Sequence, residues 1–238
     1  MREINTKRQF YEFRSHWDRI LNESVENSIF LTWEKMEPLV RRMGVKTVLK
    51  ILYAIEDSRV VAIAPFRKTR RNIAGKLGYN VIEPLANGNT DYSGIILAER
   101  ERQSLLQFLS YLFGQKDWDL FYFPDLPPTS LTLDLLKSIH ESLPRFEIDK
   151  GWICPYVEIP GSKEEMLASL SPKFRKELKR RLCKLERECG RVEFKSYEEL
   201  GSLSQAMEIL FRLHQKRWNS KGEPGAFGKQ ARQHRTNT

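Results

Sequence analysis

The segment 47–67 most constrains the fold, because it contains two β-strand patterns joined by a tight turn. Thr47–Glu56 and Arg59–Arg67 are rich in Val, Ile, Leu and Ala, and only Asp57 and Ser58 separate them. Two turn-forming residues between strand patterns predict a β-hairpin. The run Val60–Ala64 is apolar throughout and predicts the centre of the second strand.

Helical and extended patterns flank this hairpin on both sides. Upstream, we expect a short strand at Glu3–Ile4 and helices from Thr6 to about Asn22 and from Thr32 to about Met43, the second ending at Gly44. Downstream, we expect strands at Gly78–Leu85, Gly94–Leu97, Trp118–Phe123, Arg145–Ile148 and Trp152–Ile159, and helices at Glu99–Phe113 and Ser130–Glu141. The alternation predicts an α/β sheet with helices on its faces. The expected core includes Leu105, Leu106, Leu109, Leu112, Trp17, Trp118 and Trp152.

The basic charge is concentrated in the last third of the chain. The net charge is +9, of which residues 1–159 contribute +1 (22 basic, 21 acidic) and residues 160–238 contribute +8 (18 basic, 10 acidic). A basic segment indicates an anionic partner, such as a nucleotide cofactor, a nucleic acid or a phospholipid surface.

A charged helix within residues 160–238 carries much of this excess. Ser171 is predicted to cap it, Pro172 stands at its first position and Gly190 ends it. One stripe is apolar: Phe174, Leu178, Leu182, Leu185 and Cys189. The helix also holds eight Lys or Arg and three Glu. Two interpretations are open: an anion-binding face that includes Arg175, Lys176, Lys179 and Arg180, or a solvated face whose side-chain stems cover the core.

The rest of residues 160–238 contains shorter patterns. Ser162 and Glu165 form a capping box for a short helix, a strand is expected at Arg191–Lys195, and Ser196 with Glu199 opens a helix that runs to about Trp218. His214 and Trp218 lie four residues apart on one face of that helix. His214 is a candidate base, because histidine titrates near neutral pH, or a packing residue beside Trp218.

Several classes of protein and site are not indicated. No apolar run approaches the eighteen or so residues of a membrane span, and Met1–Phe10 lacks the apolar core of a signal peptide. Three cysteines without a secretion signal predict reduced thiols in the cytoplasm. Their spacing, and the scattered histidines, match no metal site.

Separated motifs resemble the CelD/BcsL-type acyltransferases of the GNAT superfamily, which are associated with cellulose and other exopolysaccharide clusters. The motifs are Pro160-Gly161-Ser162, Leu170–Arg175, Cys189-Gly190, Val192-Glu193-Phe194, Leu210–Trp218, Lys221-Gly222 and Pro224–Phe227, with weaker likeness at Val61–Pro65 and Asp91-Tyr92-Ser93. The resemblance covers residues 10–227. It implies an α/β (α+β, GNAT-like) fold with a mixed central sheet and helices on both faces, followed by the start of a second GNAT-like unit.

The resemblance also implies a domain organisation and an activity. Residues 1–159 are expected to form a first GNAT-like unit. Residues 160–227 are expected to form the basic helix together with the first strand and first helix of a second, incomplete unit. Residues 228–238 are expected to form a disordered tail. The implied reaction transfers an acyl group from acetyl-CoA or another acyl-CoA to an amine or hydroxyl, on a small-molecule or saccharide acceptor. His214 is the implied catalytic residue, and Arg175, Lys176, Lys179, Arg180 and Trp218 are the implied substrate- or phosphate-binding residues.

The sequence departs from this family at the cofactor loop. GNAT enzymes bind the cofactor pyrophosphate with backbone N–H groups at a helix start. The corresponding junction, Ile96–Glu101, has no glycine and two carboxylates. The first unit is therefore expected not to bind CoA, and the matching loop of the second unit is not in the sequence, so this chain is expected to be an inactive fragment. Two alternatives stay open: a scaffold that binds RNA or an anionic polymer through the basic helix, and a FemAB-like transferase that uses aminoacyl-tRNA.

Overall fold

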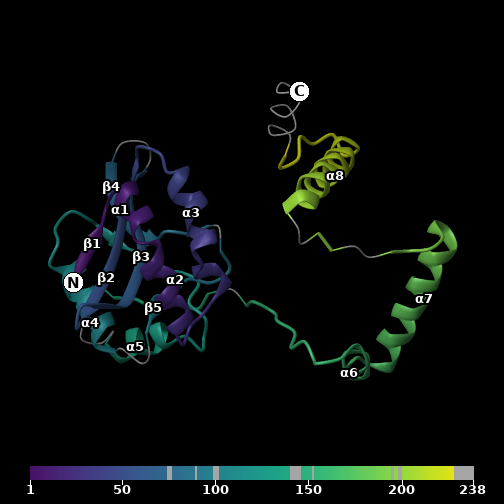
Figure 1. Ribbon diagram of the computed structural model, residues 1–238, viewed down its shortest axis with the longest axis horizontal. Coiled ribbons are helices and arrows are strands. Elements are labelled where there is room, and N and C mark those ends of the chain that lie inside the picture. Colours follow the sequence, from purple (N-terminus) through teal and green to yellow (C-terminus); the bar gives the residue numbers. More distant parts are fainter. Residues whose placement is uncertain are drawn as a thin grey trace. The chain divides into compact units, whose positions relative to one another are not determined.

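The computed structural model describes residues 1–73, 77–88, 90–98, 102–139, 146–151, 153–193, 196–197 and 200–227. The chain divides into two compact units, Met1–Pro155 and Tyr156–Thr238. The predicted boundary at residue 159 lies four residues after this division. Figure 1 labels most of the helices and strands of the two units.

Unit 1 is built on one mixed β-sheet. Its strands are β1 (Arg2–Ile4), β2 (Thr47–Glu56), β3 (Arg59–Ile73), β4 (Leu77–Pro84), β5 (Ile96–Leu97) and β6 (Leu120–Phe121). The order is β1-β2-β3-β4-β6, with β5 paired to β3. Every pairing is antiparallel except that of β4 with β6, which is parallel. The mixed sheet that the sequence predicted is therefore present.

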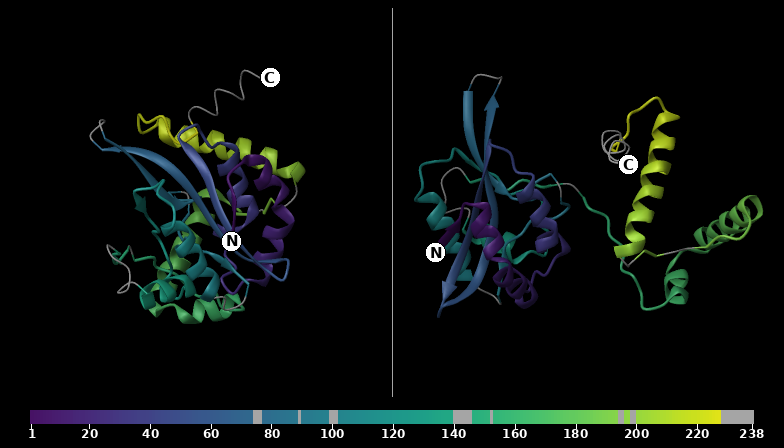
Figure 2. Two further views of the ribbon diagram at one scale, coloured as in Figure 1. Left: turned by 90° about the vertical axis from the view of Figure 1, so that its left-hand side faces the viewer. Right: turned by 45° about the horizontal axis from the view of Figure 1, so that its top comes forward.

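The central hairpin is confirmed. β2 and β3 pair antiparallel from Glu56 and Arg59 outward, and they form the long twisted ribbon seen in Figure 2. Asp57 and Ser58 have φ angles of +45° and +65°. Positive φ at both central residues matches the right-handed twist of the strands that a two-residue turn joins.

Helices cover both faces of the sheet (Figure 1). They are α1 (Lys7–Glu12), α2 (Arg14–Glu23) and α3 (Trp33–Arg41), with a short 3-10 turn η1 (Ile29–Leu31), and α4 (Arg102–Phe113) and α5 (Leu131–Ile139). One buried cluster joins α1–α3 to Ile51 and Ile63, and a second joins α4 and α5 to Leu52, Ala62 and Ala64. Because neighbouring strand residues point to opposite faces, the apolar strands supply both layers.

Several predicted elements have different bounds. The helix expected over 6–22 breaks at Phe13, which closes α1 and opens α2 with φ −90° and ψ −1°. Thr32 precedes α3, but its side chain makes no capping bond, and Gly44 does not take the left-handed conformation of a C-terminal glycine. The strand expected over 118–123 is only two residues long. Residues 99–101 and 140–141 lie outside the described residues.

The two strands expected after α5 are wrong where the structure describes them. Residues 146–148 and 153–159 are irregular, and Ile153, Val157 and Ile159 are 86, 71 and 88% exposed. A strand needs a neighbour for its backbone groups, and none of the described strands pairs with this segment. Arg145 and Trp152 lie outside the described residues.

Unit 2 contains three described helices, α6 (Lys163–Ser169), α7 (Pro172–Cys189) and α8 (Leu200–Asn219). The predicted caps of α7 are confirmed: Ser171 Oγ accepts the Phe174 N–H at 3.2 Å, and Gly190 has φ +75°. Ser162 Oγ likewise accepts the Glu165 N–H at 3.1 Å. Arg191–Glu193 form no strand, and Phe194, Lys195 and Glu199 lie outside the described residues. The tail from residue 228 onward also lies outside them.

Candidate functional site

A cavity of about 290 Å³ is bounded by three segments of unit 1. They are the loop after α2, Tyr92 and Ser93 between β4 and β5, and residues 127–131, which follow β6 and include the first residue of α5. The parallel pair of β4 and β6 ends with a bond from the Tyr122 N–H to the Ile82 carbonyl oxygen, at 2.8 Å. The lining residues are Val25, Glu26, Asn27, Ser28, Leu31, Tyr92, Ser93, Pro127, Thr129, Ser130 and Leu131.

The loop after α2 is held in place by the aromatic core. Trp17 is fully buried, and its Nε1–H donates to the Leu31 carbonyl oxygen at 2.9 Å. Ser28 Oγ accepts the Phe30 N–H at 3.3 Å. The Phe30 ring meets the Tyr92 ring edge-on, with centroids 5.9 Å apart. These contacts give the cavity one wall that is anchored in the core of unit 1.

Glu26 caps the start of α5 from this loop. Its Oε1 accepts the backbone N–H of Leu131, the first residue of α5. Ser130 Oγ accepts the Leu133 N–H at 3.4 Å. A carboxylate is favoured at a helix N-terminus, because unpaired N–H groups and the helix dipole carry positive charge there. Glu26 is the one charged side chain among the described lining residues.

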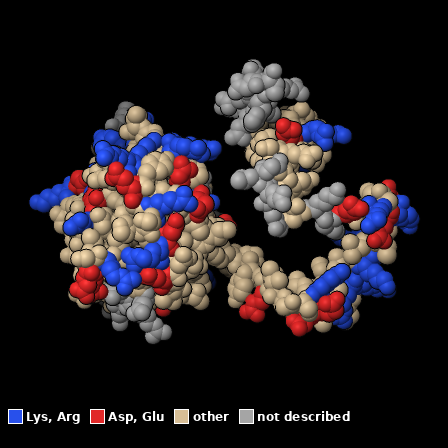
Figure 3. All heavy atoms as spheres, viewed as in Figure 1, with Lys and Arg blue, Asp and Glu red and all other residues tan. Residues whose placement is uncertain are grey.

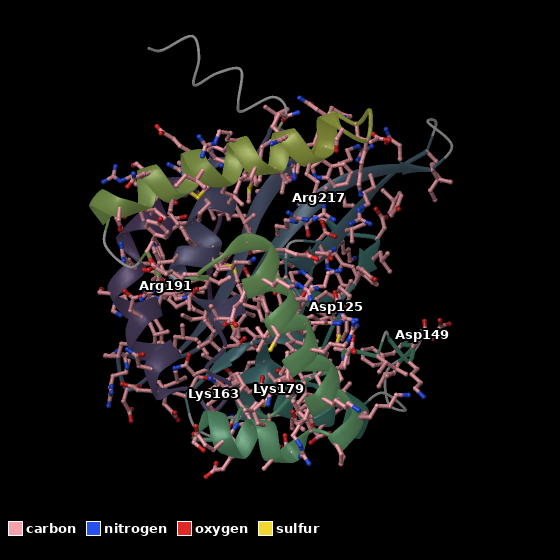
Figure 4. All side chains as sticks on the ribbon, turned by 90° about the vertical axis from the view of Figure 1, so that its right-hand side faces the viewer. Asp125, Asp149, Lys163, Lys179, Arg191 and Arg217 are labelled. Atoms are coloured by element: carbon pink, nitrogen blue, oxygen red, sulfur yellow. The ribbon has the colours of Figure 1, made fainter. Side chains whose placement is uncertain are left out.

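Ser93 also lines the cavity, and its hydroxyl oxygen is buried. The residue is 7% exposed, and its Oγ has no hydrogen-bond partner among the described residues. Its backbone N–H donates to the Asp125 carbonyl oxygen at 2.9 Å. Asp125, labelled in Figure 4, has a φ of +59° in the loop after β6. The two loops are thus tied together next to an unpaired polar group.

A buried charge lies near the end of β4. The Glu83 side chain is 1% exposed, and its Oε1 accepts from Arg67 Nε at 3.1 Å. Its Oε2 accepts from Arg71 Nη2 and, at 2.6 Å, from Asn87 Nδ2. Both carboxylate oxygens of Glu83 therefore accept hydrogen bonds, which assigns this cluster to the stability of the β3–β4 pair.

The start of α5 does not fit the pyrophosphate of acyl-CoA. Such a group needs free N–H groups at a helix start. At α5 the Leu131 N–H is bonded to the Glu26 carboxylate, which repels a phosphate. At α4 the preceding residues Glu99, Arg100 and Glu101 lie outside the described residues. No cofactor-binding role is assigned to unit 1.

Four of the five predicted substrate- or phosphate-binding residues lie on α7, in unit 2, and the fifth, Trp218, lies on α8 (Lys179 is labelled in Figure 4). Arg175 Nη1 donates to the carbonyl oxygens of Leu167, Ala168 and Leu170 at 3.3, 3.0 and 2.7 Å, so it caps the end of α6. Arg180 and Arg181 bind Glu177 and lower the pKa of that carboxyl to about 2.

Lys176 and Lys179 are exposed on the same helix. Neither makes a hydrogen bond or ion pair with any residue that the structure describes. Figure 3 shows Lys and Arg along α7 with Glu among them. Of the predicted anion-binding set, these two lysines are thus free to meet a partner.

His214 and Trp218 form an aromatic cluster on α8. Their ring centroids lie 5.8 Å apart, and the His214 ring is 4.6 Å from Phe227. His214 Nδ1 is buried, with no hydrogen-bond partner among the described residues. Nor does any described hydrogen bond, ion pair or ring contact join this cluster to the predicted α7 residues. These contacts support the packing interpretation of His214.

Metal and membrane sites are not found in the described part of the chain. No group of three or more His, Cys, Asp or Glu residues there could hold a metal ion. No described helix is long and apolar enough to cross a membrane. The three cysteines, Cys154, Cys183 and Cys189, are exposed and free.

Sequence reasoning found part of the cavity and missed its charged residue. Of the motif Asp91-Tyr92-Ser93, which carries part of the family likeness, Tyr92 and Ser93 line the cavity, whereas Asp91 does not. Glu26 and Ser130 were not singled out. The available signal was the polar run Glu26-Asn27-Ser28 between two helices, which resembles an ordinary connecting loop.

Comparison with known proteins gives a distant likeness to acetyltransferases. No family model matches the chain, and no curated protein matches it. Similar solved structures include the aminoglycoside antibiotic 6'-N-acetyltransferase AAC(6')-IG from Acinetobacter haemolyticus (14% identity, TM-score 0.35, covering 66% of this chain and 100% of that one). A second is a probable acetyltransferase, with 13% identity and a TM-score of 0.34, covering 68% of this chain and 100% of that one. A third is a mutant of the BH1408 protein from Bacillus halodurans, with 14% identity and a TM-score of 0.40, covering 66% of this chain and 100% of that one. These TM-scores lie below 0.5, so the function proposed below rests on the residues of this chain.

Proposed function

We propose that the chain is a GNAT-type acyltransferase protein in which unit 1 holds the acyl acceptor, an amine or hydroxyl compound, and does not hold acyl-CoA. The observation that carries this proposal is the cavity lined by segments that follow the parallel strands β4 and β6 along the chain. In open sheets, ligands bind outside the carboxyl ends of parallel strands, where neighbouring strands lead to different loops. Here, Tyr92 and Ser93 follow β4 and Pro127–Leu131 follow β6.

The chemistry of the lining supports an acceptor rather than a nucleotide. The lining combines one carboxylate with several hydroxyls and apolar surfaces, and it contains no Lys or Arg among the described residues. A carboxylate and hydroxyls accept hydrogen bonds from amine and hydroxyl groups. The family resemblance implies that acyl-CoA is the donor, and no step of the transfer is assigned to the described residues.

Calorimetric titration of the full chain tests this division. We expect a panel of small amines and hydroxyl compounds to contain members that bind, and we expect CoA not to bind. Thermal unfolding gives a second readout, because a ligand at about 100 times its Kd stabilises the folded state by about 2.7 kcal/mol. Binding of CoA to unit 1, or binding of no acceptor of either class, would overturn the proposal.

A second candidate function is polyanion binding by α7. Lys173, Lys176, Arg180, Lys184 and Arg187 follow one another at spacings of three or four residues, so they form a stripe along one face. The apolar stripe that contains Phe174, Leu178 and Leu182 lies on the opposite face. The basic stripe is roughly 21 Å long at 1.5 Å per residue, long enough to meet several phosphates of an RNA or another anionic polymer.

Salt-dependent RNA binding tests this second function. The triple change Lys176→Glu, Lys179→Glu and Arg180→Glu should abolish binding and flatten its salt dependence. A matched control places the same charge change outside α7, at Lys163, Arg217 and Lys221, and should retain most of the affinity. Equal losses in the two variants would show a general charge effect and reject a site on α7.

A further inference from the structure

Strands β3 and β4 extend past their neighbours at one end of the sheet. The pairing of β2 with β3 stops at Thr69, and that of β6 with β4 stops at Val81. Beyond these points, residues 70–73 and 77–79 form a distal strand pair that has no further strand beside it among the described residues. It reaches about 13 Å past Thr69, at about 3.3 Å per residue. Figure 2 shows β3 and β4 reaching past the helices of unit 1.

The far end of the distal strand pair exposes aliphatic side chains. Ile73 and Leu77 lie directly opposite each other on the two strands, and they are 56 and 67% exposed. Residues that lie opposite in an antiparallel pair point to the same side, so these two side chains form one apolar spot. Val45, on the loop beside the distal strand pair, is fully exposed. Exposed apolar side chains that gather in one place indicate an interaction surface, whereas single ones do not.

Two basic side chains stand behind this apolar spot. The Arg70 N–H donates to the Lys46 carbonyl oxygen at 3.1 Å, so the two residues are neighbours. Neither side chain has a hydrogen bond or an ion pair with any residue that the structure describes. The Arg70 guanidinium lies over the backbone of β4, because a Cβ added at Gly78 would be 2.5 Å from Arg70 Nη2. Figure 3 shows Lys and Arg side chains at this end of unit 1.

The acidic side chains nearby are already bonded. Glu83 and Asp117 form ion pairs with basic residues of β3, and Asp119 accepts the Asn80 N–H at 2.7 Å. Among the described residues at this end, the cations without an ion pair therefore outnumber the one carboxylate without an ion pair, that of Asp119. This balance favours an anionic partner.

We propose that the distal strand pair, together with Val45 and Lys46, binds the surface of an anionic phospholipid bilayer. With Ile73 and Leu77 at the boundary of headgroups and acyl chains, Arg70 lies three residues, or about 10 Å, behind them. This spacing suits contacts with lipid phosphates, because the headgroup layer is about 5–8 Å thick on each side of the hydrocarbon. The free backbone edges limit the strands to this layer, since hydrocarbon cannot satisfy N–H and C=O groups.

A single-stranded nucleic acid fits the same residues less well. Binding of that kind stacks bases on aromatic side chains. The exposed apolar residues here are aliphatic, and the one aromatic residue of the distal strand pair, Tyr79, is half-buried. The inference uses neither the cavity of unit 1 nor the basic stripe of α7, so it goes beyond the proposed function and does not depend on it.

Sedimentation with lipid vesicles tests the proposal on the full chain. The two probes are vesicles of phosphatidylcholine alone and vesicles of phosphatidylcholine mixed with phosphatidylserine. We expect the chain to bind the mixed vesicles at least about tenfold more tightly than the neutral ones, and we expect high salt to remove this preference. Equal binding to both vesicles, or binding to neither, overturns the proposal.

Two double variants test the residues. Ile73→Ser with Leu77→Ser should weaken binding to the mixed vesicles about tenfold or more, because the apolar contact is lost. Lys46→Gln with Arg70→Gln should weaken it about 25-fold, which is about fivefold for each cation. All four side chains are exposed, so both variants should unfold at the temperature of the unchanged chain.

Matched controls change the same residue types elsewhere. Ile29→Ser with Leu106→Ser alters two exposed aliphatic side chains of unit 1, and Lys176→Gln with Lys179→Gln alters two free cations of α7. Both controls should bind the mixed vesicles like the unchanged chain. A loss confined to the α7 control places the lipid contact on α7 and overturns the proposal. Loss of RNA binding in Lys46→Gln with Arg70→Gln, without any vesicle binding by the unchanged chain, replaces the bilayer by a nucleic acid.

Discussion

The carboxylate of Glu26 accepts a hydrogen bond from the backbone N–H of Leu131, which lies 105 residues further along the chain. This bond joins the loop after α2 to the first turn of α5. It places a negative charge at the cavity and satisfies one of the N–H groups that a helix leaves unpaired at its start. The same contact therefore serves the stability of unit 1 and the chemistry of its cavity.

Replacing Glu26 by Ala should destabilise unit 1 by about 1 kcal/mol, which is typical for loss of a capping side chain. Glu26→Gln should cost less, because its amide oxygen still accepts the Leu131 N–H. Urea unfolding followed by tryptophan fluorescence measures both free energies. Equal stability of the Ala variant and the unchanged chain would show that this cap contributes nothing.

Replacing Glu83 by Ala should lower the free energy of unfolding of unit 1 by more, about 3–5 kcal/mol, because the change leaves Arg67 and Arg71 without their buried partner. The control is Glu56→Ala at the exposed end of the hairpin, which should change the free energy of unfolding by less than about 0.5 kcal/mol. Similar small changes in the two variants would contradict the assignment of Glu83 as a structural ion-pair centre.

The stability contributed by Asp117 should fall in acid. A hydrogen bond from Lys68 and the nearby charge of Lys50 lower the pKa of Asp117 below its ordinary value of 3.8, against the opposing effect of burial. A carboxyl whose pKa is lower in the folded state stabilises that state above its ordinary pKa, and the contribution is lost as the pH falls through the lower folded pKa.

The measurement is the difference in unfolding free energy between the unchanged chain and Asp117→Asn across pH. We expect the difference to be largest near neutral pH and to shrink progressively below pH 3.8. A difference that is constant with pH would show that Asp117 acts through its shape rather than its charge.

Gly225 lies against the aromatic cluster of α8, and its replacement by Ala should disturb that cluster. An added Cβ would lie 2.9 Å from His214 Cε1 and 3.0 Å from Trp218 Cγ, and the residue has a φ of +68°. Gly222→Ala is the matched control, because Gly222 has a similar φ of +74° and no atom within 4 Å of an added Cβ.

Both glycine variants should lose about 1 kcal/mol or more of local stability through the positive φ. Only Gly225→Ala should also shift the fluorescence of Trp218, which is best measured with the other tryptophans replaced by Phe. The same spectrum in both variants would contradict the close packing of Gly225 on Trp218.

Local patterns predicted several elements correctly. The hairpin follows from two strand patterns and the turn at Asp57 and Ser58, and α7 follows from Ser171, Pro172 and Gly190. In each case neighbouring residues supply both the hydrogen bonds and the backbone preference. Within α4, Leu105, Leu109 and Leu112 are buried as predicted, but Leu106 is 48% exposed and Phe108 is buried instead. The helical period favours Phe108, three residues after Leu105 and four before Leu112.

The errors fall where a distant partner decides the outcome. The apolar alternation of residues 153–159 resembles a strand, yet a strand forms only beside another strand, and the described sheet offers none to this segment. The sequence also shows an apolar stripe on α7 without indicating its partner, and in the structure Phe174, Leu182 and Leu185 are 55, 48 and 40% exposed. Periodicity indicates which residues share a face and does not indicate what covers that face.

The hairpin, the caps of α7 and the mixed α/β character of unit 1 could be predicted from the sequence, because they depend on neighbours within a few residues. The basic charge of residues 160–238 could also be predicted, because it depends on composition alone. Only the tertiary structure decided the cavity. Glu26 and Ser93 come from two loops and Leu131 from the start of α5, and these three places are far apart in the sequence but line one cavity. No local pattern records a contact whose two sides are fixed by the packing of the whole unit.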